Sequence, residues 1–162
     1  KADLATYKNY LTSIGSPTDD AKADPYRTQG EWRFFLRSTT PGDKRDPAAI
    51  SASGDVVSER AKGRWHKFLS QKDATPEALA AHVLWLLGAS SVADKDTTSD
   101  KQAKKIITPP QLTREAADTV RLTFWQITPP NMNSPFQVVV TAAPGKDVII
   151  LSTHWKELTK KR

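Results

Sequence analysis

The sequence has no cysteine, and this absence excludes several kinds of chemistry. A chain without thiols has no disulfide framework, no thiolate zinc site and no cysteine nucleophile. Glycine is also scarce, with seven among 162 residues. Neither a phosphate-binding loop nor a Gly-x-Gly-x-x-Gly turn for a dinucleotide occurs. The sequence therefore predicts no cofactor.

Long hydrophobic runs and catalytic motifs are missing as well. The longest apolar run covers residues 83–89, whereas a membrane-spanning helix needs about 20 apolar residues. The three histidines lack metal-ligand spacing, and no His-Glu-x-x-His, Gly-x-Ser-x-Gly or Ser-x-x-Lys motif is present. Because some hydrolases lack all of these motifs, an enzyme is not excluded. We nevertheless expect a non-enzymatic protein without a transmembrane segment.

The residues that are present fit one folded, loop-rich domain over 1–162. Positive charge gathers towards the C-terminus: residues 101–162 carry 10 Lys and Arg against 4 Asp and Glu, while residues 1–100 carry 14 of each. Such a basic segment either improves solubility or attracts an anionic partner. The first residue is Lys1, which is typical of a mature exported protein and equally of a trimmed chain. We expect a periplasmic or secreted location.

Helical patterns dominate the first two thirds of the chain. Apolar residues at three- and four-residue spacing predict helices over 4–14 and 55–69. The range 75–88 begins with a Thr-Pro cap, ends at glycine and is apolar nearly all round, so we expect it to be the central helix. The range 31–37 fits helix and strand spacing equally, and we predict a helix there. Residues 89–108 are polar without periodicity, which predicts a long surface loop.

The C-terminal third has the patterns of an antiparallel sheet. Residues 120–127 alternate as a strand does, and 136–155 predict a hairpin that turns at Pro144-Gly145. If Ala143 and Lys146 are the residues that flank this turn, the register of the hairpin pairs Gln137 with Ser152. The predicted fold class is α+β, with N-terminal helices packed on a C-terminal antiparallel meander of three or more strands. A curved sheet of this kind would form a cone, as in cystatin-like or nuclear-transport-factor-like domains, which is a comparison of folds alone.

This register places a set of side chains on one sheet face, turned away from the main hydrophobic layer. Trp125 is the anomaly, because it points away from the apolar face of its own strand. A surplus of apolar surface there favours a protein partner or a small apolar ligand. The leading hypothesis is thus a binding or assembly module that uses Trp125, Gln137, Val139, Ile150, Ser152 and His154.

Two alternative functions stay open. In the first, His154 is the general base of a small enzyme, which requires a carboxylate to orient its ring. In the second, nucleic acid binds a basic stripe at i, i+4 and i+7 of the 55–69 helix, formed by Arg60, Arg64 and Lys67, together with the basic C-terminus. Such a row beside an apolar face is commonly a solvated flank. We expect His82, on the most apolar helix, to be a hydrogen-bonded core residue.

Overall fold

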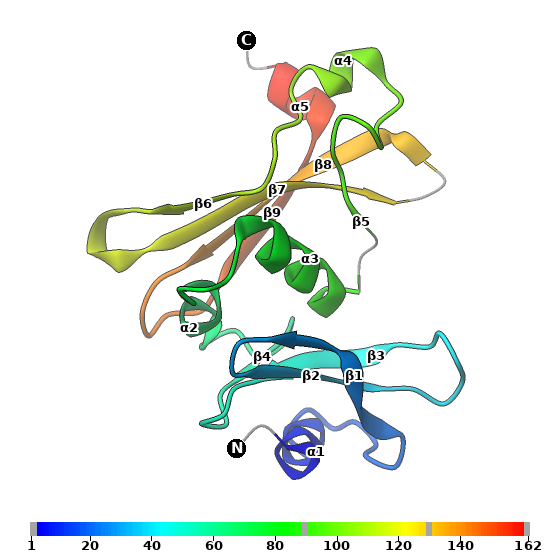
Figure 1. Cartoon of the computed structure of the whole chain (residues 1–162), viewed down its shortest axis with the longest axis vertical. Helices are drawn as coiled ribbons and strands as arrows, with labels where there is room; N and C mark the ends of the chain where they lie inside the picture. The colour runs from blue at the N-terminus through cyan, green and yellow to red at the C-terminus, as the bar shows by residue number, and fades with distance from the viewer. Residues whose placement is uncertain (1–2, 89–90, 129–130, 161–162) are drawn as a thin grey trace.

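The computed structural model describes residues 3–88, 91–128 and 131–160 and confirms an α+β protein with two antiparallel sheets (Figure 1). None of the helices in these ranges has the length and apolar composition that a bilayer crossing requires. The elements are α1 (Leu4–Ser13), β1 (Ala21–Gln29), β2 (Trp32–Arg37), β3 (Arg45–Ile50), β4 (Val56–Val57), α2 (Trp65–Leu69), α3 (Pro76–Leu86), β5 (Ser91–Val92), α4 (Lys101–Lys104), β6 (Gln111–Arg114), the 3₁₀ turn η1 (Ala116–Asp118), β7 (Val120–Thr128), β8 (Asn131–Ala142), β9 (Ile149–His154) and α5 (Trp155–Thr159).

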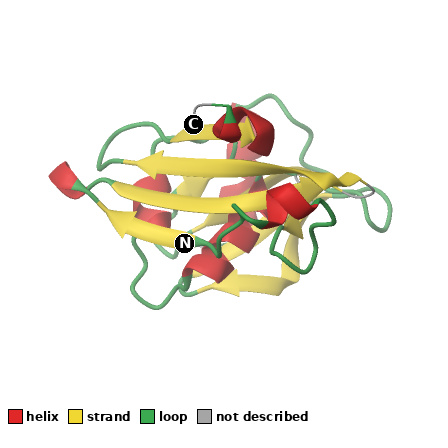
Figure 2. Cartoon of the chain, turned by 90° about the horizontal axis from the view of Figure 1, so that it is seen from above, coloured by secondary structure: helices red, strands yellow, loops and turns green. Residues whose placement is uncertain are grey.

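The elements stack as alternating layers of helix and sheet (Figure 1). The first sheet, in the order β1-β2-β3-β4, lies between α1 and the pair α2 and α3. The second sheet, in the order β5-β7-β8-β9 with β6 also paired to β7, lies on the other side of α3. Figure 2 shows the same stack from above, with the strands running across the helices. We call the face of the second sheet towards α3 its inner face and the opposite one its outer face.

Three hydrophobic clusters fill the spaces between these layers. The central core joins both sheets to α2 and α3, and it includes Phe34, Phe68, Val83, Leu122 and Val140. A second cluster lies between α1 and the first sheet and contains Tyr7, Leu11 and Phe35. The third, which we call the outer cluster, contains Trp125, Ile127, Trp155, Ala93, Ala103 and Ile107. Each fully buried large side chain contributes about 1.5 to 3 kcal/mol to folding.

The range 31–37, predicted as a helix, is the strand β2. Both faces of this strand are covered: Trp32 and Phe34 enter the central core, while Phe35 stacks on Tyr7 of α1 with ring centroids 5.4 Å apart. A strand that is buried on both faces has a nearly continuous apolar run. The spacing of apolar residues therefore did not distinguish strand from helix here.

The helix predicted over 55–69 forms only at its end, as α2, and its beginning is the strand β4. The hydroxyl of Ser58 accepts the backbone N–H groups of Arg60 (3.2 Å) and Ala61 (2.9 Å). The indole N–H of Trp65 donates to the carbonyl of Ser58 (3.0 Å). A serine that satisfies backbone groups in this way competes with helix formation. The helices expected over 4–14 and 75–88 are confirmed as α1 and α3.

The hairpin of β8 and β9 forms as predicted, but its register differs by one residue. The turn is present, with Gly145 at φ 71° and the N–H of Lys146 donating to the carbonyl of Ala143 (3.2 Å). The strands, however, pair Gln137 with Thr153. The residue before β9, Val148, donates its N–H to the carbonyl of Lys62 (2.9 Å). A slip of one residue turns every side chain of a strand to the other face.

The range 89–108, expected to be a long loop, contains β5 and α4. Residues 89–90 lie outside the described ranges. The helix α4 begins at Asp100, whose carboxylate accepts the N–H groups of Gln102 (2.8 Å) and Ala103 (3.0 Å). The side chain of Ala103 then enters the outer cluster. This segment therefore covers part of the second sheet.

Candidate functional site

The observed register separates the residues that were expected to share one face. Trp125 pairs with Gln137, and Gln137 pairs with Thr153. Trp125 and Gln137 therefore lie with Val139 on the outer face. Ile150, Ser152 and His154 lie on the inner face. The expectation of one shared face is wrong, because β9 is turned over relative to the predicted pairing. A binding role for any of these residues stays a prediction.

Trp125 is part of the hydrophobic interior. Its side chain is 2% exposed, and it packs in the outer cluster with residues that include Trp155 at the start of α5. A small cavity of about 220 Å³ lies beside it, lined also by Ile106, Gln137, Leu158 and Thr159. The helices α4 and α5 thus cover this end of the outer face, which sequence reasoning left open.

His154 caps a helix. Its Nδ1 atom accepts the backbone N–H of Lys156 (3.2 Å), and its ring lies edge-on to Phe136 with centroids 5.0 Å apart. In the described part of the chain no carboxylate hydrogen-bonds to this ring, and no group of three or more His, Asp and Glu side chains could hold a metal ion. These contacts give His154 a structural role as the N-cap residue of α5.

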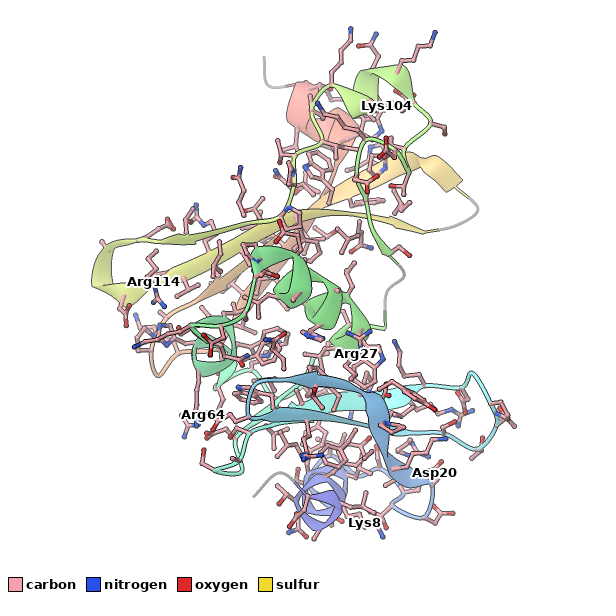
Figure 3. The ribbon with its side chains drawn as sticks, viewed as in Figure 1. Lys8, Asp20, Arg27, Arg64, Lys104 and Arg114 are labelled. Atoms are coloured by element: carbon pink, nitrogen blue, oxygen red, sulfur yellow. The ribbon has the colours of Figure 1, made fainter. Side chains whose placement is uncertain are left out.

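His82 is buried, as the sequence predicts, at 8% exposure. The guanidinium of Arg27, a residue of β1 whose side chain extends towards α3 (Figure 3), is 2.7 Å from its Nδ1 atom, and Gln29 Oε1 is 3.0 Å from its Nε2 atom. Because arginine only donates, Nδ1 accepts and Nε2 carries the proton. Burial, reinforced by the charge of Arg27, lowers the pKa of His82 to about 4. The ring is therefore neutral and structural at pH 7.

The predicted basic stripe is largely neutralised. Lys67 Nζ lies 2.6 Å from Asp55 Oδ2, and Arg64 Nε lies 3.4 Å from Asp55 Oδ1. The hydrogen bond from Lys67 lowers the pKa of the Asp55 carboxyl. Arg60 stands apart on the loop before α2 and donates to the carbonyl of Ile14 (3.5 Å). Paired cations attract phosphate groups less than a free row does.

The strand β9 forms an open edge of the second sheet. It ends the strand order, and no strand in the described ranges pairs with its far side. Backbone groups of successive residues in an antiparallel strand point alternately to the two sides. Since the N–H of Val148 points away from β8, towards Lys62, those of Ile150 and Ser152 point to the same side. Among the described residues, no hydrogen bond from these two N–H groups is present, so this edge offers backbone groups for pairing.

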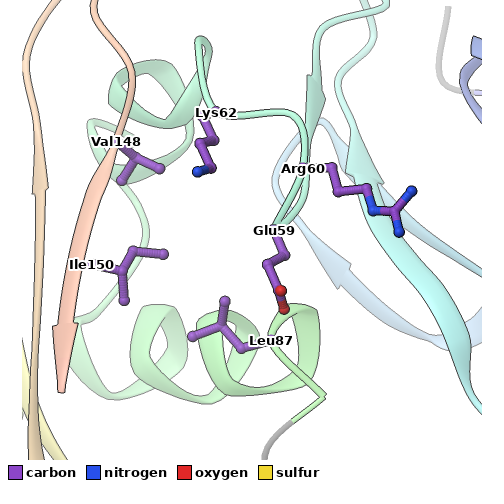
Figure 4. Close-up of a pocket in the computed structure, with 6 residues that line it drawn as sticks. All are labelled: Glu59, Arg60, Lys62, Leu87, Val148 and Ile150. Carbon is purple, nitrogen blue, oxygen red and sulfur yellow. The ribbon is translucent and has the colours of Figure 1, made fainter. Parts of the chain in front are cut away.

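A cavity of about 570 Å³ lies along this edge (Figure 4). Its apolar wall consists of Val148, Ile150 and Leu87, the last of which follows α3. Figure 4 shows Val148 and Ile150 pointing into the space, with Glu59 and Lys62 reaching towards it from the loop after β4. We call this space the β9 groove. It offers room for a side chain next to the open edge.

The opposite side of β9 is also apolar. Ile149 and Leu151 are 58% and 61% exposed on the outer face, where Leu151 pairs with the half-buried Val139. The predicted register had not placed Ile149 and Leu151 on this face. The apolar run 148–151 fits both registers, so the sequence contains no local signal that would have revealed these two exposed residues.

No protein family, curated protein or solved structure matched this chain. The main indication of function is the geometry of the β9 edge, with its outward-pointing backbone groups and an apolar surface on each side.

Proposed function

We propose that this protein is a binding module that accepts an extended segment of a partner protein as an additional strand on β9. The observation that carries this proposal is the unpaired edge with apolar side chains on both of its sides. In strand addition, backbone hydrogen bonds provide affinity and alternate side chains provide specificity. The β9 edge offers outward-pointing backbone groups for such hydrogen bonds and apolar side chains on both sides for such contacts.

The edge also lacks the features that protect most edge strands. Natural edges carry charged residues, proline or bulges that prevent pairing with another chain. Residues 149–151 of β9 are Ile, Ile and Leu, and its pairing to β8 runs without a register shift. An unprotected apolar edge favours a role in pairing.

The alternation of side chains specifies how a partner segment would lie. One of its side chains would enter the β9 groove beside Ile150 and Leu87, and its neighbours in sequence would cover Ile149 and Leu151. Covering each of these two exposed side chains would contribute about 1 to 2 kcal/mol. The cone-like curvature of the sheet, the export of the protein and the enzymatic and nucleic-acid alternatives stay predictions.

Phage-displayed random peptides test this proposal. Peptides enriched on the wild-type protein should lose binding to Ser152→Pro, because proline removes an edge N–H without removing a bond to β8. Leu151→Lys should weaken binding at least about tenfold, since it places a charge on the apolar outer side. Tyr26→Lys is the matched control, because Tyr26 is 96% exposed on the first sheet.

Circular dichroism and thermal unfolding establish that each variant is folded before its binding is compared. The proposal is wrong if the enriched peptides bind Ser152→Pro as they bind the wild type. It is also wrong if the peptides, added to the ¹⁵N-labelled protein, shift NMR amide signals outside β9 and the β9 groove. The oligomeric state is measured by sedimentation. If the wild type is a dimer and Ser152→Pro is a monomer, the edge pairs with a second copy of the chain and the partner-protein proposal is overturned.

A further inference from the structure

A larger cavity, of about 660 Å³, opens at the other end of α3. It shares no lining residue with the β9 groove. Glu77 and Ala81, in the first half of α3, line this cavity, whereas Leu87, which follows the end of α3, lines the β9 groove. The buried Ala93 and Ile107 of the outer cluster line it, as does Val92, which packs against the central core. The cavity therefore opens where the two clusters meet. We call it the α3 cavity.

The walls of the α3 cavity are mostly apolar and its remaining lining is mostly acidic. Pro109 and Pro110 complete the apolar walls. The charged lining residues are three carboxylates and one ammonium group, those of Glu77, Asp94, Asp96 and Lys95. The whole chain carries a formal charge of +6, so this cavity has a local charge opposite to that of the protein.

The carboxylates of this cavity are available for a ligand. Asp94 Oδ1 accepts the backbone N–H groups of Asp96 and Thr97, both at 2.8 Å, which holds the turn in place. Within the described ranges neither Glu77, Asp94 nor Asp96 forms an ion pair with a cation of the chain. Three carboxylates without a cationic partner in the described ranges, beside one ammonium group, favour a cation and repel an anion.

We propose that the α3 cavity binds a small organic cation, an amine attached to a compact apolar body. Cavities for small ligands have about 300 to 1,000 Å³ and combine apolar walls with a few convergent polar groups, and the α3 cavity, at about 660 Å³, has both. The apolar body lies against Val92, Ala93 and Ile107, and the ammonium group faces the carboxylates. This site goes beyond strand addition at β9 and does not depend on it.

Three probes that share a benzyl group and differ in charge test the proposal. They are 2-phenylethylamine, 2-phenylethanol and phenylacetate, each titrated into the full ¹⁵N-labelled chain. The amide signals of Ala93 and Ile107 should shift with the amine. The amine should bind about 3- to 10-fold more tightly than the alcohol, because partly exposed ion pairs are individually weak. Phenylacetate should bind most weakly, and added salt should reduce the advantage of the amine.

Two variants separate the charge from the cavity. The triple variant Glu77→Gln, Asp94→Asn and Asp96→Asn keeps an oxygen acceptor at each position, so it should bind amine and alcohol equally. Ala81→Trp, at an exposed position of α3, should fill the space and remove binding of both. Ser152→Pro should bind the amine as the wild type does, which distinguishes a failure here from a failure at β9.

The proposal is overturned if the wild-type protein binds amine and alcohol with equal affinity, or if the amine shifts signals remote from Ala93 and Ile107. Undiminished amine binding by folded Ala81→Trp would overturn it as well. If Ala81→Trp does not fold, the comparison of amine with alcohol in the triple variant decides, because loss of the amine's advantage requires the carboxylates.

Discussion

The imidazole of His82 makes the stability of this protein depend on pH between about 4 and 6.5. The ring stacks on Phe34 with centroids 4.7 Å apart and is 8% exposed. Its two nitrogens bind Arg27 and Gln29 in the neutral form. Protonation would place a proton on Nδ1 against the Arg27 guanidinium, which also donates. The folded structure therefore disfavours the charged ring.

The size and sign of the effect follow from the two pKa values. The ring titrates near pH 6.5 in the unfolded chain and at about 4 in the folded protein. Between these values the unfolded chain binds more protons, so the free energy of unfolding falls as the pH falls. The contribution of the neutral ring is complete above about pH 6.5 and is lost towards pH 4. The gap corresponds to about 3 kcal/mol at most.

Urea unfolding of the wild type and of His82→Gln from pH 4 to 7 measures this contribution. Glutamine can accept from Arg27 and donate to Gln29 as the neutral ring does, but it does not titrate. Subtracting the two stabilities at each pH removes the effect of the carboxylates. The wild type should lose up to about 3 kcal/mol relative to the variant as the pH falls. Parallel curves, or a Cε1 proton of His82 that titrates near 6.5, would refute this reasoning.

Two further predictions concern the register and an ion-pair cluster. Leu122→Ala should destabilise the protein by about 2 to 5 kcal/mol in urea unfolding and Leu151→Ala by less than about 0.5; equal losses would contradict the register. Arg37→Gln should lower the melting temperature, because Arg37 binds both Asp20 (2.8 Å) and Asp46 (3.0 Å). Hydrogen bonding to Arg37 lowers the pKa of Asp20. The difference in melting temperature between the wild type and Arg37→Gln should therefore be full at neutral pH and shrink in acid as Asp20 protonates. A difference that stays constant down to pH 2 would contradict this.

The helices α1 and α3 were predictable because their signals are local. Asp3 Oδ1 accepts the N–H of Thr6 (2.9 Å), and Thr75 Oγ1 accepts the N–H of Ala78 (3.1 Å). Each cap and the apolar face that follows it lie within a few turns of chain. The alternation of β7 was equally local, and Val120, Leu122 and Phe124 are all buried in the central core.

The errors arose where distant contacts decide the structure. β2 is a strand because α1 covers one of its faces and α3 the other. The loop after β4 is held partly by Tyr10, whose hydroxyl lies 2.6 Å from Ser58 Oγ. In the observed register of β9, the N–H of Val148 donates to the carbonyl of Lys62, which is remote in sequence. Spacing within a segment contains no information on such partners.

The candidate site shows the same limit. Val139, Ile150 and Ser152 were predicted as binding residues, and they do lie on or beside the open edge, but on two faces instead of one. Trp125 was the most prominent of the predicted residues, and the structure buries it under α4 and α5. An apolar residue on the second face of a strand indicates either a ligand or a further layer, and the chain beyond the strand decides which.

The charge of the chain bears on which partner the β9 edge would accept. Two exposed apolar residues on an unprotected edge would favour association between identical copies, but a formal charge of +6, gathered in the segment that forms the second sheet, opposes it. The same charge attracts an acidic segment. Under the proposed function, the partner strand is therefore apolar where it lies along β9, and the residues on either side of that apolar stretch are acidic. Its association rate should fall with added salt while its dissociation rate changes little, because the charges guide the encounter and the edge holds the complex.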